Sequence, residues 1–438
     1  MNTASEASAA EPRGPAQHAG QDASGQAADA AVAAAGRAAQ AAAARLGQMP
    51  TDGLDEALRA IAARLSERAA EVIAANADDV RAARAGGLAA GFVDRLTLDQ
   101  ARVAAMTDQL RALADVPAEP SRTRVRDLPD GLELQEWRRP VGVIGANFEA
   151  RPNVVVDIAS QLIKSRNAGV LRTGSSAIGS AGVLVDEVVG PAMASAGLDS
   201  AAIQLLRAPG RETAVALVRQ PALIPLVILR GSGESTRSLA REAALHGVRT
   251  LAHADGGAVI YVDGSADRAL SLRLIEHSLD RLGVCNRLNM LLVHQEIWDA
   301  MVPAVTQLAG RLGIAVSLPP HRHALGLEWA LEPGSEATIT MAPAAGAEDA
   351  AAIANRETSR LAAAIVAEDG AAAGQFLDAY AGTGAFWNAS PRLLDGFKLL
   401  SVPETGINID NVPGPRGPVT FRDLYLRQYA VIPATYPE

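Results

Sequence analysis

The chain has 438 residues, 49% of them apolar, and a formal net charge of −9. A single hydrophobic core stops growing at roughly 250–300 residues, so two or more domains are expected, and the apolar fraction excludes global disorder. The acidic balance argues against a nucleic-acid surface, because Lys and Arg dominate phosphate binding, and it favours a small metabolite as the ligand. One cysteine cannot form an internal disulfide or a cysteine zinc site. A reducing, cytoplasmic setting without a metal site is therefore expected.

The first part of the chain predicts a tail followed by helices. Residues 1–28 are rich in Ala, Gly, Ser and Gln and are expected to be disordered. No run of eighteen apolar residues and no signal peptide is evident, so neither a membrane span nor a leader is predicted. From Ala30 to Ala114, apolar residues recur every three or four positions in an alanine-rich background. This pattern predicts helices and carries little functional information.

Strand-like patterns begin after residue 120. Residues 121–139 alternate around the turn signal Pro129-Asp-Gly131, which predicts a hairpin. Beyond it, short strand-like runs alternate with helix-like stretches, which predicts parallel sheets with crossover helices. These runs are Val141–Gly145, Gly169–Arg172, Leu226–Arg230, Val259–Asp263 and Met290–His294. The last strand-like stretch, Thr420–Pro433, is expected to pair with the hairpin as an arm.

Three places carry residues suited to chemistry. Cys285 lies between a polar helix-like stretch and an apolar strand-like run, although a lone thiol is more often a small buried hydrophobe. Polar residues crowd the carboxyl end of the first strand, where ligands of α/β sheets bind. These are Asn147, Glu149, Arg151 and Asn153. The turn Gly231-Ser-Gly233 precedes a helix and could hold a phosphate on its backbone amides, a weak signal by itself.

Taken in order, the motifs resemble the gamma-glutamyl phosphate reductases of the aldehyde dehydrogenase superfamily, over about residues 30 to 430. The resemblance rests on the series and not on any one member. The matching segments are Val141–Asn153, Ile163–Ala168, Leu171–Ile178, His253–Gly256 with Tyr261–Asp263, Val284–Asn286, Asn388–Ser390 and Arg416–Pro418.

The resemblance implies a reaction. Members of that family use NADPH to reduce an acyl phosphate to an aldehyde with release of phosphate, and Cys285 matches their nucleophile. A thioester intermediate divides the reduction into two manageable steps. The oxyanions require donors, for which the Cys285 backbone amide and an asparagine are the natural pair. Asn147 is slightly favoured over Asn153, and either asparagine could instead hold its own loop.

The resemblance also assigns a cofactor site. Arg172 with Ser175 and Ser176 offers phosphate partners and no carboxylate that would repel a 2′-phosphate, which favours NADPH over NADH. Arg172 could alternatively be a surface cation at a strand end. The other residues assigned to the cofactor are Lys164, Gly231 and Ser232.

The substrate site departs from the family pattern. Its assigned residues are Glu149, Arg151, Asn286, Arg287 and His253. The family's glutamate after the cysteine is lost, and its Cys-His and His-Ser-Glu groups are replaced by Ala258-Val259 and Leu361-Ala-Ala363. Arg287 is an added cation that could meet an extra carboxylate or phosphate, or point to solvent. The chain is therefore either a drifted reductase or a paralogue for another acyl phosphate.

Two other classes stay open. A non-phosphorylating aldehyde dehydrogenase would need a general base for thioester hydrolysis, and His253 or Asp255 could serve. A catalytically inactive family member is the second, against which the intact Cys285-Asn286 pair argues.

The expected fold is α/β and aldehyde-dehydrogenase-like, with two domains built on parallel sheets and a β-arm for oligomerisation. Residues 29–120, 140–244 and 396–418 would form the NADP-binding domain, and 245–395 the catalytic domain. Residues 121–139 and 419–438 would form the arm. The expected partners are an acyl phosphate or aldehyde and further copies in a homodimer or homotetramer, with neither nucleic acid nor membrane.

Overall fold

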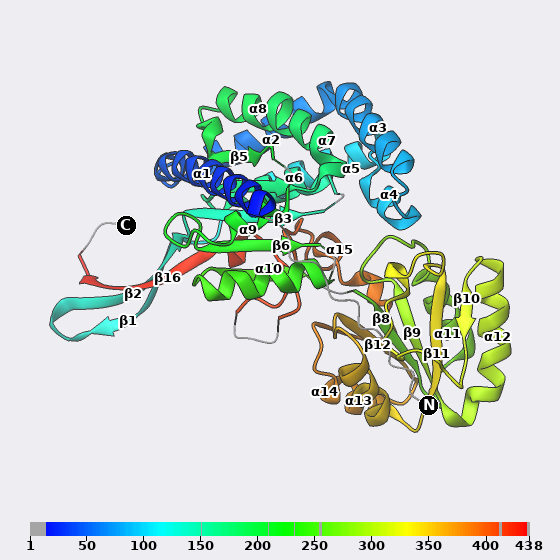
Figure 1. Cartoon of the computed structure of the whole chain (residues 1–438). Helices are drawn as coiled ribbons and strands as arrows, with labels where there is room; N and C mark the ends of the chain where they lie inside the picture. Colours follow the sequence, from blue (N-terminus) through cyan, green and yellow to red (C-terminus); the bar gives the residue numbers. More distant parts are fainter. Residues whose placement is uncertain are drawn as a thin grey trace, which may run out of the picture.

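The computed structural model describes residues 15–149, 151–208, 210–231, 233–253, 256–410 and 414–435. Figure 1 shows two lobes, each built around a sheet with helices on its faces, and a long arm that extends from the first lobe. The sheets confirm the predicted α/β class. They follow from buried runs of branched and apolar residues that alternate with amphipathic helices.

The first lobe contains a parallel five-stranded sheet in the order β5-β4-β3-β6-β7. Its strands are β3 (Val143–Phe148), β4 (Ala168–Thr173), β5 (Ile203–Leu206), β6 (Leu226–Arg230) and β7 (Arg249–His253). Its main helices are α1 (Pro15–Leu46), α2 (Thr51–Glu67), α3 (Ala69–Ala85), α4 (Ala90–Leu96), α5 (Gln100–Asp115), α6 (Asn153–Lys164), α7 (Ile178–Val183), α8 (Gly190–Ser195), α9 (Arg211–Leu217), α10 (Gly233–Leu245) and α15 (Gly396–Leu400). Sheet and helices enclose one large core.

The second lobe contains a parallel six-stranded sheet in the order β10-β11-β9-β8-β12-β13. Its strands are β8 (Ala258–Val262), β9 (Leu288–His294), β10 (Ala315–Ser317), β11 (Thr338–Ala344), β12 (Ala362–Val366) and β13 (Gly384–Trp387). Its helices are α11 (Arg268–His277), α12 (Trp298–Arg311), α13 (Ala347–Glu357) and α14 (Gly370–Ala379). Separate apolar clusters fill its two faces, as expected for a sheet buried on both sides.

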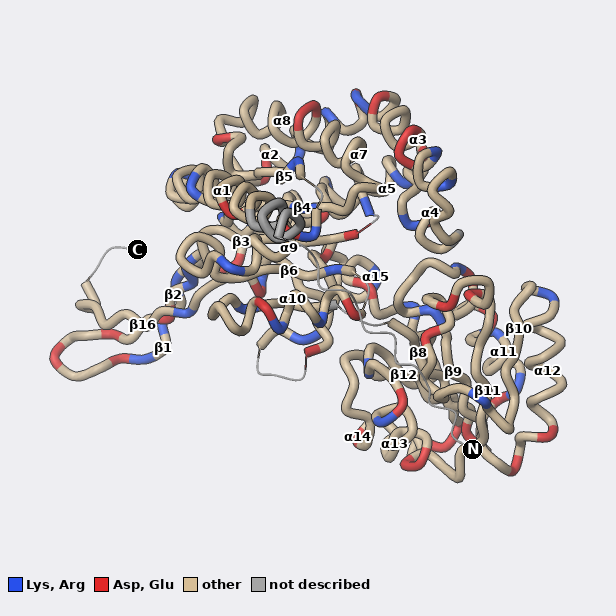
Figure 2. The backbone as a smooth tube through the Cα atoms, viewed as in Figure 1, with Lys and Arg blue, Asp and Glu red and all other residues tan. Residues whose placement is uncertain are grey.

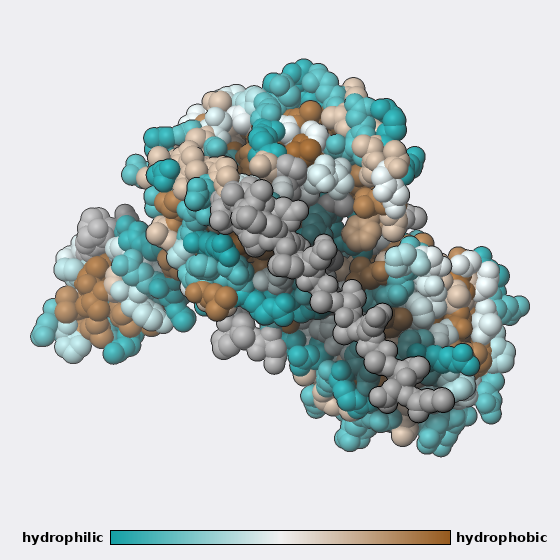
Figure 3. All heavy atoms as spheres, viewed as in Figure 1, coloured by the Kyte–Doolittle hydropathy of each residue, from teal (hydrophilic) through white to brown (hydrophobic). Residues whose placement is uncertain are grey.

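The arm is an antiparallel sheet of β1 (Arg122–Leu128), β2 (Leu132–Pro140) and β16 (Tyr425–Pro433). The predicted pairing of the hairpin with the C-terminal strand is confirmed, since Tyr425 pairs with Pro140 and Pro433 with Leu132. Tyr429 and Val431 of β16 are 58% and 56% exposed. Apolar side chains gather on this arm in the space-filling view (Figure 3). A short ribbon of β14 (Gly406–Asn408) and β15 (Gly417–Val419) lies nearer the first lobe.

One expectation about the first lobe was wrong. The helix α1 begins at Pro15, so the expected disordered tail is helical from there, and residues 1–14 lie outside the described part of the chain. Alanine's high helix propensity and the burial of Ala28 and Val32 in the core explain this result. The 21-residue helix Ser175–Ser195 is also long and apolar enough to cross a membrane by composition. Its Leu184, Val188 and Met193 belong to the main core, so we interpret it as a core helix.

Helix α6 is tied to α2 by a buried ion pair. The Lys164 Nζ donates to Asp55 Oδ1 and to the Val116 carbonyl, both at 2.6 Å, and the Lys164 side chain is 1% exposed. Helix α6 runs from the carboxyl end of β3 back toward the start of β4. The ion pair therefore fixes the end of α6 at the side of the sheet where the strands begin.

Replacing Asp55 with Ala should lower the thermal unfolding midpoint, because it leaves a buried ammonium group without its counter-ion, at a cost of about 3–5 kcal/mol. The double variant Asp55→Leu with Lys164→Met should recover much of that loss. The exposed Asp52 of the same helix provides the control, Asp52→Ala. Equal midpoints for Asp55→Ala and Asp52→Ala would contradict a structural role for the pair.

Candidate active site

A cavity of about 360 Å³ contains Cys285, together with residues that follow β3 and β6 of the first lobe. It therefore lies at the carboxyl ends of the first-lobe strands, where α/β sheets bind ligands. Basic side chains outnumber carboxyl groups in its lining. The basic residues are Arg95, Arg102, Arg151, Arg230, Arg281, Arg392 and Lys398, and the acidic ones are Asp157, Asp395 and Glu404.

Cys285 lies on the loop between α11 and β9 and is partly buried. The Gly257 amide donates to the Cys285 carbonyl at 2.7 Å. A Cβ at Gly256 would lie 2.8 Å from that carbonyl oxygen and 2.6 Å from a Glu328 carboxylate oxygen. Only glycine permits so close an approach, so the Gly256-Gly257 segment braces the nucleophile loop from behind.

Asn286 holds the loop from the other side. Its Nδ2 donates to the Leu394 carbonyl at 2.9 Å, and its Oδ1 accepts from Arg392. Arg392 in turn donates through Nε to Asp280 Oδ1 at 2.8 Å and is 7% exposed. Asn286 is therefore fixed within the protein as a support of Cys285, although it also lines the cavity.

Helix α4 of the first lobe clamps the same loop. The Asp94 carboxylate accepts from Arg102 Nη2 at 2.7 Å and from Arg281 Nη2 at 2.8 Å. Arg95 Nε donates to the Gly283 carbonyl at 2.6 Å. Although burial opposes ionisation, the bonds from Arg102 and Arg281 hold the pKa of Asp94 below its usual value. Cys285 is therefore positioned by contacts from both lobes.

Burial sets the charges of several groups in the cavity. It lowers the pKa of Arg151 to about 9, with Arg230 the next contributor. It raises the pKa of Asp157 to about 6 and that of Glu404 to about 7, while Arg230 opposes both shifts. At neutral pH Glu404 is therefore partly uncharged, which leaves the cavity more positive than its residue list implies. Such a site suits an anionic ligand.

The two asparagines proposed for the oxyanion lie in different places. Asn153, the first residue of α6, lines the Cys285 cavity, and its Nδ2 donates to Asp157 Oδ2 at 2.9 Å. Asn147 is 3% exposed on β3, and its Oδ1 accepts from Arg172 Nη1 at 3.0 Å. The cavity therefore brings Asn153 to Cys285. The preference for Asn147 is not supported by this geometry.

Of the predicted cofactor residues that the structure describes, all but Lys164 lie at the ends of β4 and β6 or directly after them. Arg172 is 7% exposed and donates to Asn147 and, at 3.1 Å, to the Gly210 carbonyl. Ser175 is exposed and Ser176 half-buried on the turn after β4. Ser232 lies outside the described residues. Lys164 is the exception, because its ion pair with Asp55 holds it at the opposite edge of the sheet.

Glu149 belongs with the cofactor residues and not with the Cys285 cavity. Its Oε1 accepts from Ser235 Oγ at 3.2 Å, and a Cβ at Gly231 would lie 3.1 Å from its carboxyl carbon. Burial lowers the pKa of Arg172, and the Glu149 charge opposes that shift. A carboxylate is thus present near this edge, which corrects the expectation that none is there.

One other substrate assignment also changes, and that of His253 is not tested by the structure. Arg287 is 3% exposed and donates to the carbonyls of Glu336 at 2.7 Å and Thr338 at 3.1 Å, so it faces away from the cavity. Its burial lowers its pKa to about 10. The backbone of His253 ends β7, and its side chain lies outside the described part. Arg151 is the assigned substrate cation that does line the cavity.

The family model for the aldehyde dehydrogenase family matches residues 3–321. The chain belongs to this family. It is 36% identical to a gamma-glutamyl phosphate reductase of Clavibacter michiganensis subsp. michiganensis over 86% of this chain and 88% of the relative. A gamma-glutamyl phosphate reductase of Thermobifida fusca is 33% identical over 88% and 93% of the two chains.

Solved structures agree with this assignment. The crystal structure of gamma-glutamyl phosphate reductase from Thermotoga maritima superposes with a TM-score of 0.82 at 25% identity, over 93% of this chain and 99% of that one. An acetylating aldehyde dehydrogenase from Geobacillus thermoglucosidasius, 16% identical with a TM-score of 0.72, shares the fold. The aldehyde dehydrogenase family uses nicotinamide cofactors, so this chain is an oxidoreductase that acts on an aldehyde or acyl phosphate.

The sequence interpretation missed one wall of this aldehyde dehydrogenase cavity. Arg95, Thr97 and Arg102 come from the helical region that was expected to carry little function. Alanine-rich periodicity conceals such residues, since their role depends on where α4 and α5 pack. Arg230 was also missed. Glu404 lies in the segment Glu404-Thr-Gly-Ile407, which matches a family segment but to which the sequence assigned no role.

Replacing Asp94 with Asn should reduce kcat by about tenfold, because a neutral amide cannot hold both Arg102 and Arg281 and misplacement of a nucleophile is costly. The KM for the nicotinamide cofactor should stay unchanged, since the Asp94 carboxylate bonds to Arg102 and Arg281 and to none of the residues assigned to the cofactor. Steady-state kinetics measure both constants. The exposed Asp108 of α5 provides the control, Asp108→Asn. A selective rise in cofactor KM would contradict the clamp.

Proposed function

We propose that this protein reduces an acyl phosphate to the corresponding aldehyde, with NADPH as reductant and gamma-glutamyl phosphate or a close relative as substrate. The observation that carries the proposal is Cys285 in a cavity whose charged lining residues are mostly arginines. Relatives named gamma-glutamyl phosphate reductase match this chain over most of their length. A substrate that bears a phosphate and a carboxylate complements such a lining.

The chemistry begins at Cys285. Its thiolate attacks the acyl carbon, a C–S bond forms, and the C–O bond to phosphate breaks, with phosphate leaving with the electron pair. Arg151 and Arg230 are the cavity cations that would bind the departing phosphate. Asn153 Nδ2 and the Cys285 amide would stabilise the tetrahedral oxyanion.

The second half-reaction regenerates the free Cys285 thiolate. When bound, the nicotinamide supplies a hydride to the thioester carbon. The oxyanion of the resulting thiohemiacetal is held by the same donors. As its carbonyl re-forms, the C–S bond breaks, which releases the aldehyde and the Cys285 thiolate. The close packing of Gly256 and Gly257 against the cysteine loop limits how far that thiolate moves.

The cofactor edge fits a dinucleotide phosphate. Arg172 at the end of β4 and the turn at Gly231, before the 13-residue helix α10, bring a cation and a helix N-terminus to one side of the sheet. Arg172 with Ser175 and Ser176 supports a 2′-phosphate and hence NADPH. The Glu149 carboxylate acts on Arg172 and would weaken the preference for NADPH over NADH.

Three of the altered family positions lie in an apolar cluster beside Cys285. Ala258, Leu361 and Ala362 are at most 1% exposed and belong to a cluster against which Cys285 packs. No charged side chain takes the place of the family's polar groups at these positions. This supports, as a variant of the proposal, a substrate less polar than gamma-glutamyl phosphate.

A non-phosphorylating aldehyde dehydrogenase is the second candidate. The Gly256 amide donates to Glu328 Oε2 at 3.0 Å, so a carboxylate lies beside the segment that braces Cys285. A carboxylate there is suited to activate water for thioester hydrolysis. The two candidates differ in their need for phosphate.

The wild type should produce NADPH from NADP⁺ and glutamate-5-semialdehyde only when phosphate is present, because phosphate must resolve the thioester. Cys285→Ala should lose this activity by at least about a thousandfold, as expected when a nucleophile is removed. Absorbance at the NADPH band reports the rate, and a panel of less polar aldehydes tests for a less polar substrate. Phosphate-independent turnover would favour the second candidate, and NADPH binding without any turnover would favour an inactive member.

We also propose that the arm joins subunits into a dimer or tetramer, because it exposes Tyr429 and Val431 next to an unpaired strand edge. Val431→Asp should lower the solution mass measured by light scattering, since it places a charge in that contact. Gln428→Asp adds the same charge at an exposed polar position of β16 and is the control. A monomeric wild type would refute this role.

A further inference from the structure

A second cavity, of about 350 Å³, lies where the arm joins the first lobe. It is formed by the turn after α1, the linker before β1, the last residues of β2, the start of β16 and the end of α6. Lys164 of α6 lines it, whereas Asn153 at the other end of that helix lines the Cys285 cavity. The two cavities therefore lie at opposite ends of the strands of the five-stranded sheet. The second cavity is separate from the cavity of the proposed reaction.

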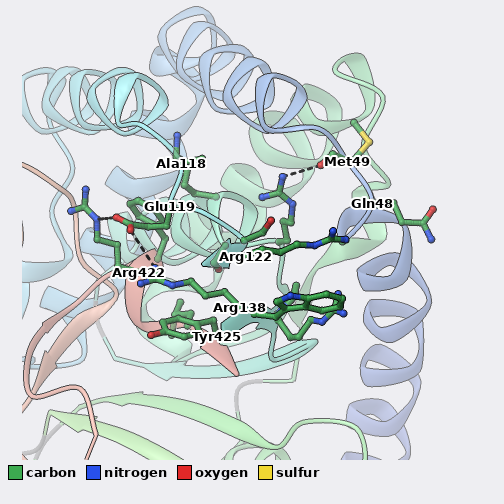
Figure 4. Close-up of a pocket in the computed structure, with 18 residues that line it drawn as sticks. Gln48, Met49, Ala118, Glu119, Arg122, Arg138, Arg422 and Tyr425 are labelled. Atoms are coloured by element: carbon green, nitrogen blue, oxygen red, sulfur yellow. Dashed lines mark hydrogen bonds and ion pairs between the residues drawn. The ribbon is translucent and has the colours of Figure 1, made fainter. Parts of the chain in front are cut away.

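This arm-base cavity is strongly basic in an acidic chain. Six cations line it, namely Arg122, Arg138, Arg139, Lys164, Arg166 and Arg422, and Glu119 is the carboxyl group among its lining residues. Figure 4 shows Glu119 between Arg422 and Arg138, with Arg122 on the far side of Arg138. Figure 2 shows basic residues recurring along β2 where it leaves the lobe. A net charge of −9 over the whole chain makes this local excess unusual.

Aromatic rings hold the arginines in place. The guanidinium carbons of Arg122 and Arg139 lie 4.6 and 4.5 Å from the centroid of the Trp137 ring. Arg138 lies 4.5 Å from the Tyr425 ring. Stacking uses the flat face of a guanidinium and leaves its edge donors available for oxyanions. Because cations already cover these rings, a ligand would be recognised through anionic groups and not through a stacked base.

One carboxyl group bridges two of these arginines. Glu119 accepts from Arg422 Nε at 2.7 Å and from Arg138 Nη1 at 3.3 Å (Figure 4). It connects the linker before β1 to both β2 and the chain just before β16. Among the residues that line the cavity, six are cations and one is a carboxyl group, and Asp55 pairs with one of these cations, Lys164.

Arg166 occupies a backbone conformation that favours glycine. Its φ is 61°, in the left-handed region, and the side chain reaches the cavity lining. Its Nη2 donates to the Met49 carbonyl at 3.1 Å and to Thr51 Oγ1 at 3.2 Å. Burial lowers its pKa, while Asp55 opposes that shift. The left-handed residue caps the end of α6, where the Asn167 amide donates to the Leu162 carbonyl at 2.8 Å, and its side chain adds a cation to the cavity lining.

We propose that the arm-base cavity binds a small molecule or ion bearing two or more negative charges, through its phosphate or carboxylate oxygens. Charge-assisted bonds from Arg122, Arg138 and Arg139 would hold it. The ligand could be inorganic phosphate released by the reaction or an organic polyanion, and the binding chemistry is the same. Its site is distinct from that of the acyl phosphate.

Titration calorimetry on the full chain would test the proposal with three probes: inorganic phosphate, pyrophosphate and citrate. Wild type should bind at least one of them saturably. The double variant Arg122→Gln with Arg139→Gln should bind roughly tenfold more weakly or worse, because each lost charge-assisted bond is costly. Phosphate alone as the ligand would identify the reaction product, whereas citrate or pyrophosphate would indicate a separate polyanion.

Two controls separate this site from other causes. Arg124→Gln with Arg126→Gln removes the same charge from β1 outside the cavity lining and should bind as wild type does. Arg151→Gln alters the Cys285 cavity and should leave this binding intact. Equal losses in both double variants would overturn the proposal in favour of nonspecific attraction. A loss confined to Arg151→Gln would assign the binding to the active site, and absence of saturable binding would mean that the cations only anchor the arm.

Discussion

The position of Cys285 depends on a loop that both lobes hold. Its own lobe supplies the Gly257 bond to the cysteine carbonyl, and α4 of the first lobe supplies Asp94 and Arg95. A nucleophile fixed from two sides keeps its reacting atom near the strand ends, where the substrate and the nicotinamide must meet. Any relative movement of the lobes would strain or break the Asp94 clamp, so lobe geometry and cysteine position are coupled.

Charge burial follows from this arrangement. Closing a cavity between two lobes removes water from arginines that would otherwise be solvated, which lowers the pKa of Arg151 to about 9 and raises that of Glu404 to about 7. The cations remain protonated at neutral pH, whereas Glu404 is partly neutral. The protein thus keeps an unbalanced positive charge in a poorly hydrated site, a cost that an anionic substrate would relieve.

The sequence was sufficient for the strands and the arm because both depend on local patterns. Period-two alternation around Pro129-Asp-Gly131 predicted the hairpin, and its pairing with residues 425–433 followed from the similar character of the last stretch. Residue roles were harder to predict. Arg287 lies two residues after the nucleophile in sequence, yet its side chain donates to the carbonyls of Glu336 and Thr338, which come from a distant part of the chain.

Side-chain direction and long-range packing account for the remaining differences. Lys164 lies in a motif shared with the reductases, but twelve residues of α6 carry it from the strand carboxyl ends to the opposite edge, where Asp55 neutralises it. Asn147 is turned by Arg172, a residue 25 positions later that pairs with it across β3 and β4. The shared motifs therefore identified residues that matter to the fold. The position of each residue along its helix or strand determines which cavity it faces.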